Sequence, residues 1–229
     1  MGQKNGETEV KTKLVVVGDC GCGKSTLIKR FVSNIYSDTY TATGFDTYHS
    51  TYKVSASYTI QMSIWDTSGD PGYDRVRPVS YTDADLVLVC FSIGNPESLH
   101  NIVTKWLPEI REHCPTQPII VVGCGSDLRE DEAVLSKLAK DNQVPITYEQ
   151  GLKTAKDIEA LVYSETSAKT SEKSVKDVLE VAALSSVGTK SSETHLKRQK
   201  SFIKRKRFSG MGEAKTTLRK EATKSCAIM

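Results

Sequence analysis

The chain has 229 residues, enough for one full domain with flanking segments or for two small domains. No apolar run approaches the roughly 18 residues of a membrane-spanning helix, and the first residues lack the apolar stretch of a secretory signal, so we expect neither kind of protein. The six cysteines show no metal-ligand spacing and indicate reduced cytosolic thiols. The net charge of +3 hides a basic end, since residues 188–229 carry 12 Lys and Arg against 3 Asp and Glu.

The predicted elements alternate between strands and helices. Apolar runs predict buried strands at 13–17, 86–91, 119–122 and 161–164, and alternating patterns predict an antiparallel pair at 52–54 and 58–65. Helices are predicted at 24–32, 96–113, 131–142, 150–160 and 172–185. This order predicts an α/β domain with a mostly parallel sheet and helices on both faces. Ligand sites in such folds lie at the carboxyl ends of the strands.

Three regions follow from this pattern. Residues 13–187 are predicted to form the domain, and the polar residues 1–12 a disordered N-terminal extension. Residues 188–229 are rich in Ser, Thr, Lys and Arg, and we expect a disordered polybasic tail.

The first strand runs into a sequence that fits G-x-x-x-x-G-K-[ST], the phosphate-binding loop. Such a loop binds polyphosphate because its backbone N–H groups and the following helix N-terminus converge on one point. We expect Lys24 to reach the outer phosphates and the hydroxyl of Ser25 to bind Mg²⁺. The predicted nucleotide contacts here are Gly18, Asp19, Cys20, Gly21, Cys22, Gly23, Lys24, Ser25 and Thr26.

Further candidate residues follow the later strands. Asp66 ends the 58–65 strand, where a phosphate-loop protein holds Mg²⁺ through water, and Gly69 lets a backbone N–H approach the terminal phosphate. Asp127 follows the 119–122 strand and can accept hydrogen bonds from guanine, which adenine cannot offer. A helix N-cap is the alternative role for Asp127. After the last strand, Ser167, Ala168 and Lys169 form a segment in which the Ala168 N–H can contact the guanine carbonyl oxygen.

The stretch 36–45 is the least specific part of the predicted site. Thr43 is suited to complete the Mg²⁺ shell, Tyr36 to pack on the base, and Tyr40 to contact the nucleotide. The same composition also fits a Thr- and Tyr-rich edge strand, so both interpretations stay open.

These motifs, in this order, resemble a Ras-superfamily small GTPase over about residues 13–187 and at the last residues. The stretch 65–81 and the charged insert at 128–142 are similar to the Rho family, and Asp70-Pro71, Gly123-Cys124 and the C-terminus to its Rnd subgroup. The resemblance implies a six-stranded sheet with a Rho-type insert helix, GTP and Mg²⁺ as ligands, a first switch at Thr43 and a second at residues 69–81. It also implies a monomer that regulates the actin cytoskeleton through Rho-directed GTPase-activating proteins, Rho-dependent kinase or plexin-type receptors.

Two departures from the family predict little hydrolysis. Asp70 stands where the family has a water-orienting Gln; it is shorter, cannot donate an N–H, and repels a phosphate at ~5 Å by roughly 3 kcal/mol. Pro71 also biases Asp70 toward an extended backbone. Cys20 stands where hydrolytic members usually have Gly, and its side chain crowds the attacking water and any arginine finger. The implied behaviour is persistent GTP binding with no efficient catalytic residue.

A third departure leaves alternatives open. The family has Lys two residues before the guanine-binding Asp, and here that residue is Gly125, which should weaken nucleotide affinity. The alternatives are therefore a slow but cycling GTPase and a pseudo-GTPase that binds nucleotide poorly.

The C-terminus predicts a lipid anchor. Cys226 begins a C-a-a-X sequence whose final Met points to a farnesyl group. One lipid anchors only marginally, and the basic stretch 197–208 supplies a second signal toward an anionic leaflet. A nuclear localisation signal or an RNA contact is the alternative for this stretch, but the lipid motif favours the membrane. We expect the cytoplasmic face of the plasma membrane, a cytosolic pool and no nucleic-acid partner.

Overall fold

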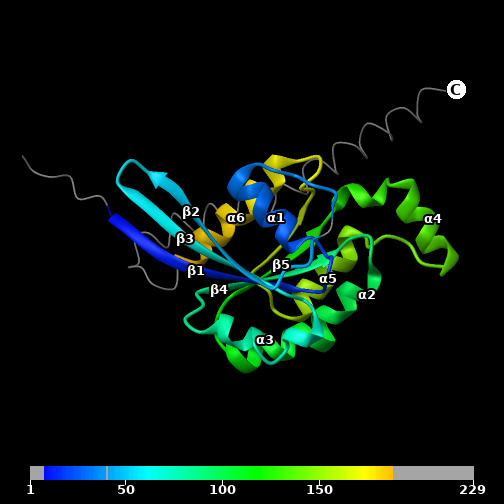
Figure 1. The fold of residues 1–229 in the computed structure, drawn as a ribbon, viewed down its shortest axis with the longest axis horizontal. Helices are drawn as coiled ribbons and strands as arrows, with labels where there is room; N and C mark the ends of the chain where they lie inside the picture. Colours follow the sequence, from blue (N-terminus) through cyan, green and yellow to red (C-terminus); the bar gives the residue numbers. More distant parts are fainter. Residues whose placement is uncertain (1–7, 40, 188–229) are drawn as a thin grey trace, which may run out of the picture. The chain divides into compact units, whose positions relative to one another are not determined.

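The computed structural model describes residues 8–39 and 41–187, which form a six-stranded sheet with helices on both faces (Figure 1). The strand order is β2-β3-β1-β4-β5-β6, and all neighbours are parallel except β2 and β3. The strands are β1 (Thr8–Gly18), β2 (Phe45–Ser55), β3 (Tyr58–Thr67), β4 (Leu86–Ser92), β5 (Ile119–Cys124) and β6 (Val162–Thr166). The helices are α1 (Lys24–Ser33), α2 (Pro96–Asn101), α3 (Leu107–His113), α4 (Glu132–Lys140), α5 (Tyr148–Asp157) and α6 (Glu172–Val187). The predicted α/β fold class and the insert helix are confirmed.

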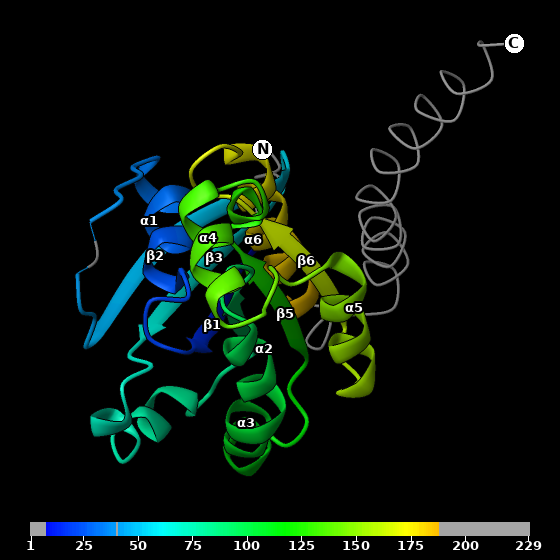
Figure 2. The ribbon, with the colours of Figure 1, turned by 90° about the vertical axis from the view of Figure 1, so that its right-hand side faces the viewer.

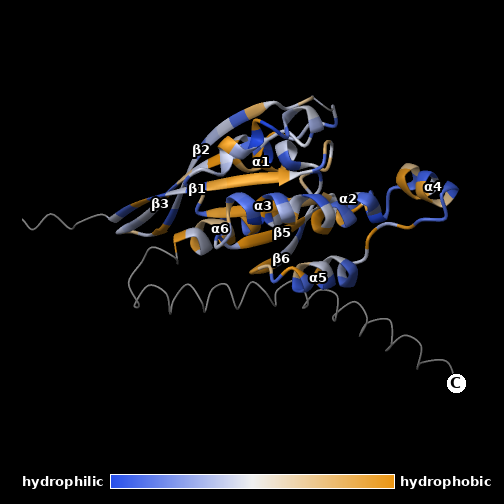
Figure 3. Ribbon diagram, turned by 90° about the horizontal axis from the view of Figure 1, so that it is seen from below, coloured by the Kyte–Doolittle hydropathy of each residue, from blue (hydrophilic) through white to orange (hydrophobic). Residues whose placement is uncertain are grey.

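Apolar side chains on both faces of the central strands form the core. On the face covered by α2, α3 and α5, Val15, Val89 and Val121 belong to one buried cluster with Trp106 and Ile110. Helices α1 and α6 pack on each other and on β1, on the opposite side of the sheet in Figure 1. Figure 3 shows that the apolar colouring of β1 is concentrated in its second half, while its start is polar.

Strand β1 begins earlier than the sequence suggests. The predicted disorder over residues 1–12 is wrong for residues 8–12, which pair in register with β3 from Thr8 opposite Tyr58 to Thr12 opposite Met62. The pairing of β1 with β4 starts only at Leu14. Backbone pairing with β3 alone therefore orders this polar stretch. Strand β2 is likewise longer than the predicted 52–54, because it pairs with β3 along its whole length.

The helix predicted at 96–113 contains a π turn. Asn95 caps α2 by accepting a hydrogen bond from the Glu97 N–H, and Pro96 occupies the first turn as expected. Residues Ile102–Trp106 then form one π-helical turn before α3. The Leu107 N–H donates to the Ile102 carbonyl, five residues back. Pro108 follows, and since it has no N–H it cannot donate to the residue four back, which disturbs the regular helix at this point.

The predictions for residues 1–7 and 188–229, including the lipid site at Cys226, concern residues outside the described part of the chain. None of the helices that the structure describes has both the length and the apolar character to cross a bilayer.

Candidate functional site

A cavity of about 660 Å³ lies at the carboxyl ends of β1 and β3. Its walls come from the phosphate loop, the stretch 35–44, the start of the segment 67–73 and one residue of the turn at Ser126–Arg129. The predicted site residues that line it are Cys20, Gly21, Gly23, Lys24, Ser25, Thr26, Tyr36, Thr43 and Gly69. Three motifs far apart in the sequence therefore meet at one edge of the sheet, as the topology predicts.

The phosphate loop is held together by its own lysine. Lys24 is buried at the start of α1, and its Nζ donates to the carbonyl oxygens of Gly18 and Asp19, each at 2.8 Å. Cys22 lies behind the loop, where its thiol donates to the Cys90 carbonyl at 3.5 Å. Burial raises the pKa of Cys22 to about 12, so this thiol stays protonated. Cys22 can therefore contact a phosphate only through its backbone.

The residues predicted to bind Mg²⁺ converge in the structure. The hydroxyls of Ser25 and Thr43 are 2.7 Å apart, although the two residues belong to different segments. Adjacent oxygen ligands of Mg²⁺ stand about 3 Å apart, so these hydroxyls fit neighbouring positions around one ion.

Asp66 supplies the negative charge of the same site. Its carboxylate is fully buried, and neither oxygen makes a hydrogen bond of ordinary geometry within the described residues, although the Ser25 hydroxyl is close enough to influence it. Burial raises the pKa of Asp66 to about 6, against the opposing influence of Ser25 and Lys24. A buried carboxylate without partners is costly unless a ligand compensates it. This set of oxygens fits a hydrated Mg²⁺ held by Ser25 and Thr43, with Asp66 bound to its water.

The second switch begins directly on the phosphate loop. A Cβ at Gly69 would lie 2.4 Å from the Gly18 carbonyl oxygen and 2.5 Å from the Cys20 nitrogen, so only glycine fits. Asp70 has the extended backbone that Pro71 predicts, with φ −70° and ψ 133°. Its carboxylate accepts the Gly72 N–H at 2.7 Å and caps the turn Pro71–Tyr73. Asp70 is thus engaged with its own turn, while Cys20 is exposed on the cavity wall.

Tyr36 lines the cavity, and Asp127 directly precedes Leu128, which also lines it. Burial raises the pKa of Tyr36 to about 12, together with a hydrogen bond to Asp38 and the charge of Asp127. Asp127 sits in the first turn of residues Ser126–Arg129, after Gly125 in a left-handed conformation with φ +74°. A Cβ at Gly125 would meet the Leu128 side chain at 2.7 Å. Glycine at this position therefore relieves both a backbone and a packing constraint.

A partly buried ion pair fixes the turn that carries Asp127. Arg129 donates from both terminal nitrogens to Glu165 at 2.7 and 2.6 Å, and its Nε donates to the Ile146 carbonyl at 2.9 Å. Tyr163 donates its hydroxyl to the same carboxylate at 2.6 Å. The turn is thereby tied to β6, and with it to the segment 167–169.

In the segment after β6, the hydroxyl of Ser167 has a mainly structural role. Ser167 is buried, and its side chain accepts hydrogen bonds from the Thr170 N–H at 3.0 Å and the Thr170 hydroxyl at 2.8 Å. Ala168 is half-buried and Lys169 is exposed.

Tyr40, in the stretch before β2, lies outside the described residues. The stretch before Phe45 forms no strand among its described residues, so the edge-strand alternative for residues 36–44 is wrong there.

Sequence reasoning missed the partners of Asp19. Its carboxylate accepts the indole N–H of Trp106 at 2.7 Å and the side-chain amide of Asn101 at 2.8 Å. The two donors are five residues apart, a spacing that regular helical periodicity assigns to different faces. The π turn between them is what lets both reach Asp19. Pro108 signals a disturbance of the helix near this point, but a proline alone does not distinguish a π turn from a kink or a helix end.

A second missed residue is Arg77. Its side chain is fully buried, and it bonds to the Ser68 carbonyl at 2.9 Å and to Glu109 at 2.7 and 2.6 Å. Asp74 pairs with it on the outer side. Burial would lower the pKa of Arg77, but the hydrogen bonds and charges of Glu109 and Asp74 raise it above its ordinary value.

The fold and this cavity define a class, that of small phosphate-loop proteins with a switch on each side of the nucleotide phosphates. A sequence profile of the Ras family matches residues 13–186, and the chain belongs to that family. Rho-related GTP-binding protein RhoE of Homo sapiens is 43% identical over 226 residues, 96% of this chain and 91% of its own length. The Mus musculus RhoE gives the same values. GTP-binding protein rho5 of Schizosaccharomyces pombe is 43% identical over 180 residues, 79% of this chain and 89% of its own length.

The protein is therefore a GTP-binding member of the Rho family that is similar to the Rnd subgroup, as the sequence motifs predict. Family membership implies a guanine nucleotide as ligand and effector proteins as partners.

Proposed function

We propose that this protein is a membrane-anchored regulator that holds GTP persistently and hydrolyses it little. In this state it presents ordered switches to effectors that act on Rho signalling and the actin cytoskeleton. The farnesylated tail places it on the cytoplasmic face of the plasma membrane, with a cytosolic pool.

The arrangement of Asp70 carries the proposal. Hydrolysis needs a group that orients the attacking water toward the terminal phosphate. The Asp70 carboxylate instead accepts the Gly72 N–H, and as an anion it cannot donate to that water. Cys20 adds a side chain at the same end of the cavity. Asp70 and Cys20 therefore both disfavour the positioning of an attacking water, whereas Lys24 remains in place for phosphate binding.

Three further observations support a bound GTP·Mg²⁺. The paired hydroxyls of Ser25 and Thr43 and the unpartnered Asp66 carboxylate fit Mg²⁺, which offsets the charge of the phosphates when bound. Tyr36 lines the cavity and the charge of Asp127 acts on its hydroxyl, which agrees with a role of both residues in binding the guanine base. The name of the RhoE relatives describes GTP-binding proteins, in agreement with this assignment.

The partners rest on the family resemblance. Rho-directed GTPase-activating proteins, Rho-dependent kinase and plexin-type receptors are the effectors that it suggests. The tail contributes the membrane contact through Cys226 and the basic stretch 197–208.

Nucleotide content tests the proposal. Freshly purified protein is denatured, and the released nucleotide is separated by chromatography before and after overnight incubation with Mg²⁺. We expect GTP at both times. Conversion to GDP at an ordinary small-GTPase rate would make the protein a cycling GTPase, and a site without nucleotide would make it a pseudo-GTPase weakened by Gly125.

A further inference from the structure

The phosphate loop and the second switch both attach to the helix that runs from Pro96 to His113. Figures 1 and 2 place the segment 69–81 beside α3, below the sheet. The loop attaches through Asp19, and the switch segment attaches through Arg77. The side chains that make these contacts are not part of the cavity lining, and their partners are other residues of the chain.

The π turn creates the first attachment. In a regular α-helix, residues five apart are rotated by about 140° around the axis and cannot meet one partner. A π turn takes in one more residue, so Asn101 and Trp106 come to one side of the helix. Both then donate to the two oxygens of Asp19, at 2.8 and 2.7 Å. The loop is thereby fixed by two hydrogen bonds to an anion, which are stronger than neutral ones.

Arg77 makes the second attachment on the same tryptophan. Its guanidinium carbon lies 4.7 Å from the centre of the Trp106 ring, a cation–π distance. The planar fork then reaches Glu109 on α3 with two hydrogen bonds and the Ser68 carbonyl with a third. Trp106 is fully buried between Asp19 on one side and Arg77 on the other.

Gly69 connects the two attachments directly. Ser68, whose carbonyl Arg77 holds, directly precedes Gly69, which packs on the backbone of the phosphate loop. Loop, helix and switch segment therefore form a closed ring of contacts within one chain. The segment is thus attached to the rest of the chain at Gly69 and at Arg77, in both cases by contacts between protein groups.

We propose that Trp106 and Arg77 are positioning residues that hold residues 68–81 in one arrangement whether the site contains GTP, GDP or no nucleotide. The inference rests on the proposed function in one respect, that residues 68–81 are the surface offered to effectors. It adds that this surface would persist even after hydrolysis, so that loss of hydrolysis is not what keeps the switch ordered.

Hydrogen exchange of the full-length protein tests the inference. The reporters are the amides of Tyr73, Val76 and Val79, whose N–H groups are hydrogen-bonded within the segment. Three forms are compared, namely protein stripped of nucleotide, protein with GDP and protein with a non-hydrolysable GTP analogue. We expect these amides to exchange within about twofold of each other in all three forms.

Trp106→Phe keeps a ring but removes the N–H donor to Asp19. It should speed exchange of the reporters about tenfold in the stripped and GDP forms, and the GTP analogue should restore slow exchange because the terminal phosphate then supplies the missing order. The matched control is Trp65→Phe, since the Trp65 indole bonds to Ser63 on β3 instead. This control should leave the reporters unchanged.

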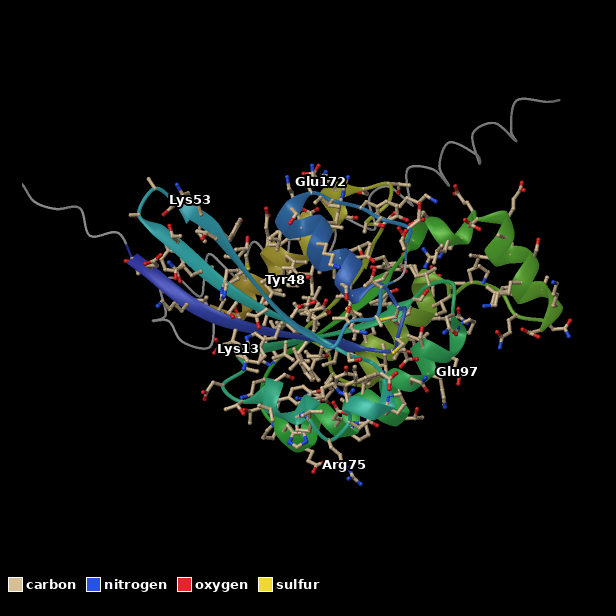
Figure 4. The ribbon with its side chains drawn as sticks, viewed as in Figure 1. Lys13, Tyr48, Lys53, Arg75, Glu97 and Glu172 are labelled. Carbon is tan, nitrogen blue, oxygen red and sulfur yellow. The ribbon has the colours of Figure 1, made fainter. Side chains whose placement is uncertain are left out.

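A second pair of variants covers the case in which Trp106→Phe does not fold. Arg77→Lys keeps the positive charge but loses the planar guanidinium group and its several N–H donors. Arg75→Lys alters an exposed side chain that points away from the sheet (Figure 4). Only Arg77→Lys should make exchange depend on the nucleotide.

Two results would overturn the inference. One is a wild-type segment that exchanges more than about tenfold faster without the terminal phosphate. The other is a Trp106→Phe effect of equal size in all three forms, which indicates a structural role only. Chromatography of the nucleotide in each purified sample tests the proposed function separately, since persistence of GTP does not enter the exchange comparison.

Discussion

Cys20 and Asp70 are close enough to the phosphate end of the cavity for their side chains to decide hydrolysis. Cys20→Gly together with Asp70→Gln restores space for the attacking water and an amide that can orient it. We expect single-turnover GTP hydrolysis to rise by about 10²-fold in the double variant, the contribution typical of one well-placed polar group. The measurement is conversion of bound GTP to GDP at saturating Mg²⁺, followed by chromatography.

The matched control changes only the length of the amide. Cys20→Gly with Asp70→Asn removes the same thiol and the same negative charge, yet the shorter amide does not reach as far as Gln. Its hydrolysis should stay well below that of the Gln variant. Equal activation of both double variants would show that loss of the thiol and the charge, and not the reach of the amide, restores the reaction.

The buried carboxylate of Asp66 predicts a pH dependence of stability. Burial raises the pKa of Asp66 from 3.8 to about 6, so the folded state binds this proton more tightly than the unfolded state does. Stability of the stripped protein should therefore fall as the pH rises from about 4 to about 6, by about 3 kcal/mol in total. Asp66→Asn should remove this loss, which urea unfolding in the presence of a chelator measures at pH 4 and 7.5.

The same substitution should act in the opposite direction once the ligand is bound. Asp66→Asn removes the negative charge that faces Mg²⁺, so the stabilisation by Mg²⁺ and nucleotide should shrink. Glu97→Gln, at an exposed carboxylate on α2 (Figure 4), is the control and should change neither value. A stripped Asp66→Asn protein less stable than wild type at pH 7.5 would contradict the assigned cost of this carboxylate.

At the scale of elements, the pair Arg129–Glu165 determines how firmly the guanine-binding turn is held. Glu165→Gln keeps the shape of the side chain and removes the charge that both terminal nitrogens of Arg129 contact. Because Gly125 gives the turn no long side chain of its own, we expect fluorescent GDP to dissociate about tenfold faster. Stopped-flow fluorescence measures this rate.

Tyr163→Phe is the control that distinguishes the ion pair from the neighbouring hydrogen bond to the same carboxylate. It removes only the hydroxyl that donates to Glu165 and leaves the contacts of Arg129 in place. Its GDP dissociation rate should stay within about twofold of wild type. If both variants release GDP equally fast, the ion pair has no special part in holding the turn.

The sequence predicted those elements whose own residues determine them. The strands β4 and β5 are continuous apolar runs, and their buried position on both faces follows directly. The start of β1 and most of β2 could not be found in this way, because they are polar and are ordered by pairing with β3. The strand conformation of these two segments is therefore determined by pairing with β3 and not by their own composition.

The candidate site divides along the same line. Lys24, Ser25 and Asp66 were predictable because each follows a strand at a fixed spacing in a known motif. The contacts of Asp19 with Trp106 were not, because they depend on a π turn that shifts the helical register. The left-handed backbone of Gly125 gives a physical reason for glycine there that the missing family lysine alone did not suggest.

For the whole molecule, the uneven charge predicts how membrane attachment is controlled. Residues 188–229 carry a net +9 and the remaining residues a net −6, so attraction to an anionic leaflet belongs to the tail alone. Cys226→Ser should abolish stable binding to vesicles, since basic residues without a lipid give only a salt-sensitive contact. Co-sedimentation of protein made in a farnesylating host with phosphatidylserine-containing vesicles measures this.

Three serines, Ser201, Ser209 and Ser225, belong to this basic sequence. Each added negative charge there opposes the leaflet by about 1 kcal/mol, so replacing all three with Glu should lower the vesicle partition coefficient on the order of 10²-fold. The triple Ala variant controls for loss of the hydroxyls and should bind as wild type does. Neutral vesicles should show no difference between the two, because the effect is electrostatic. An unchanged partition of the Glu variant on anionic vesicles would mean that the lipid, and not the charge of the tail, sets the attachment.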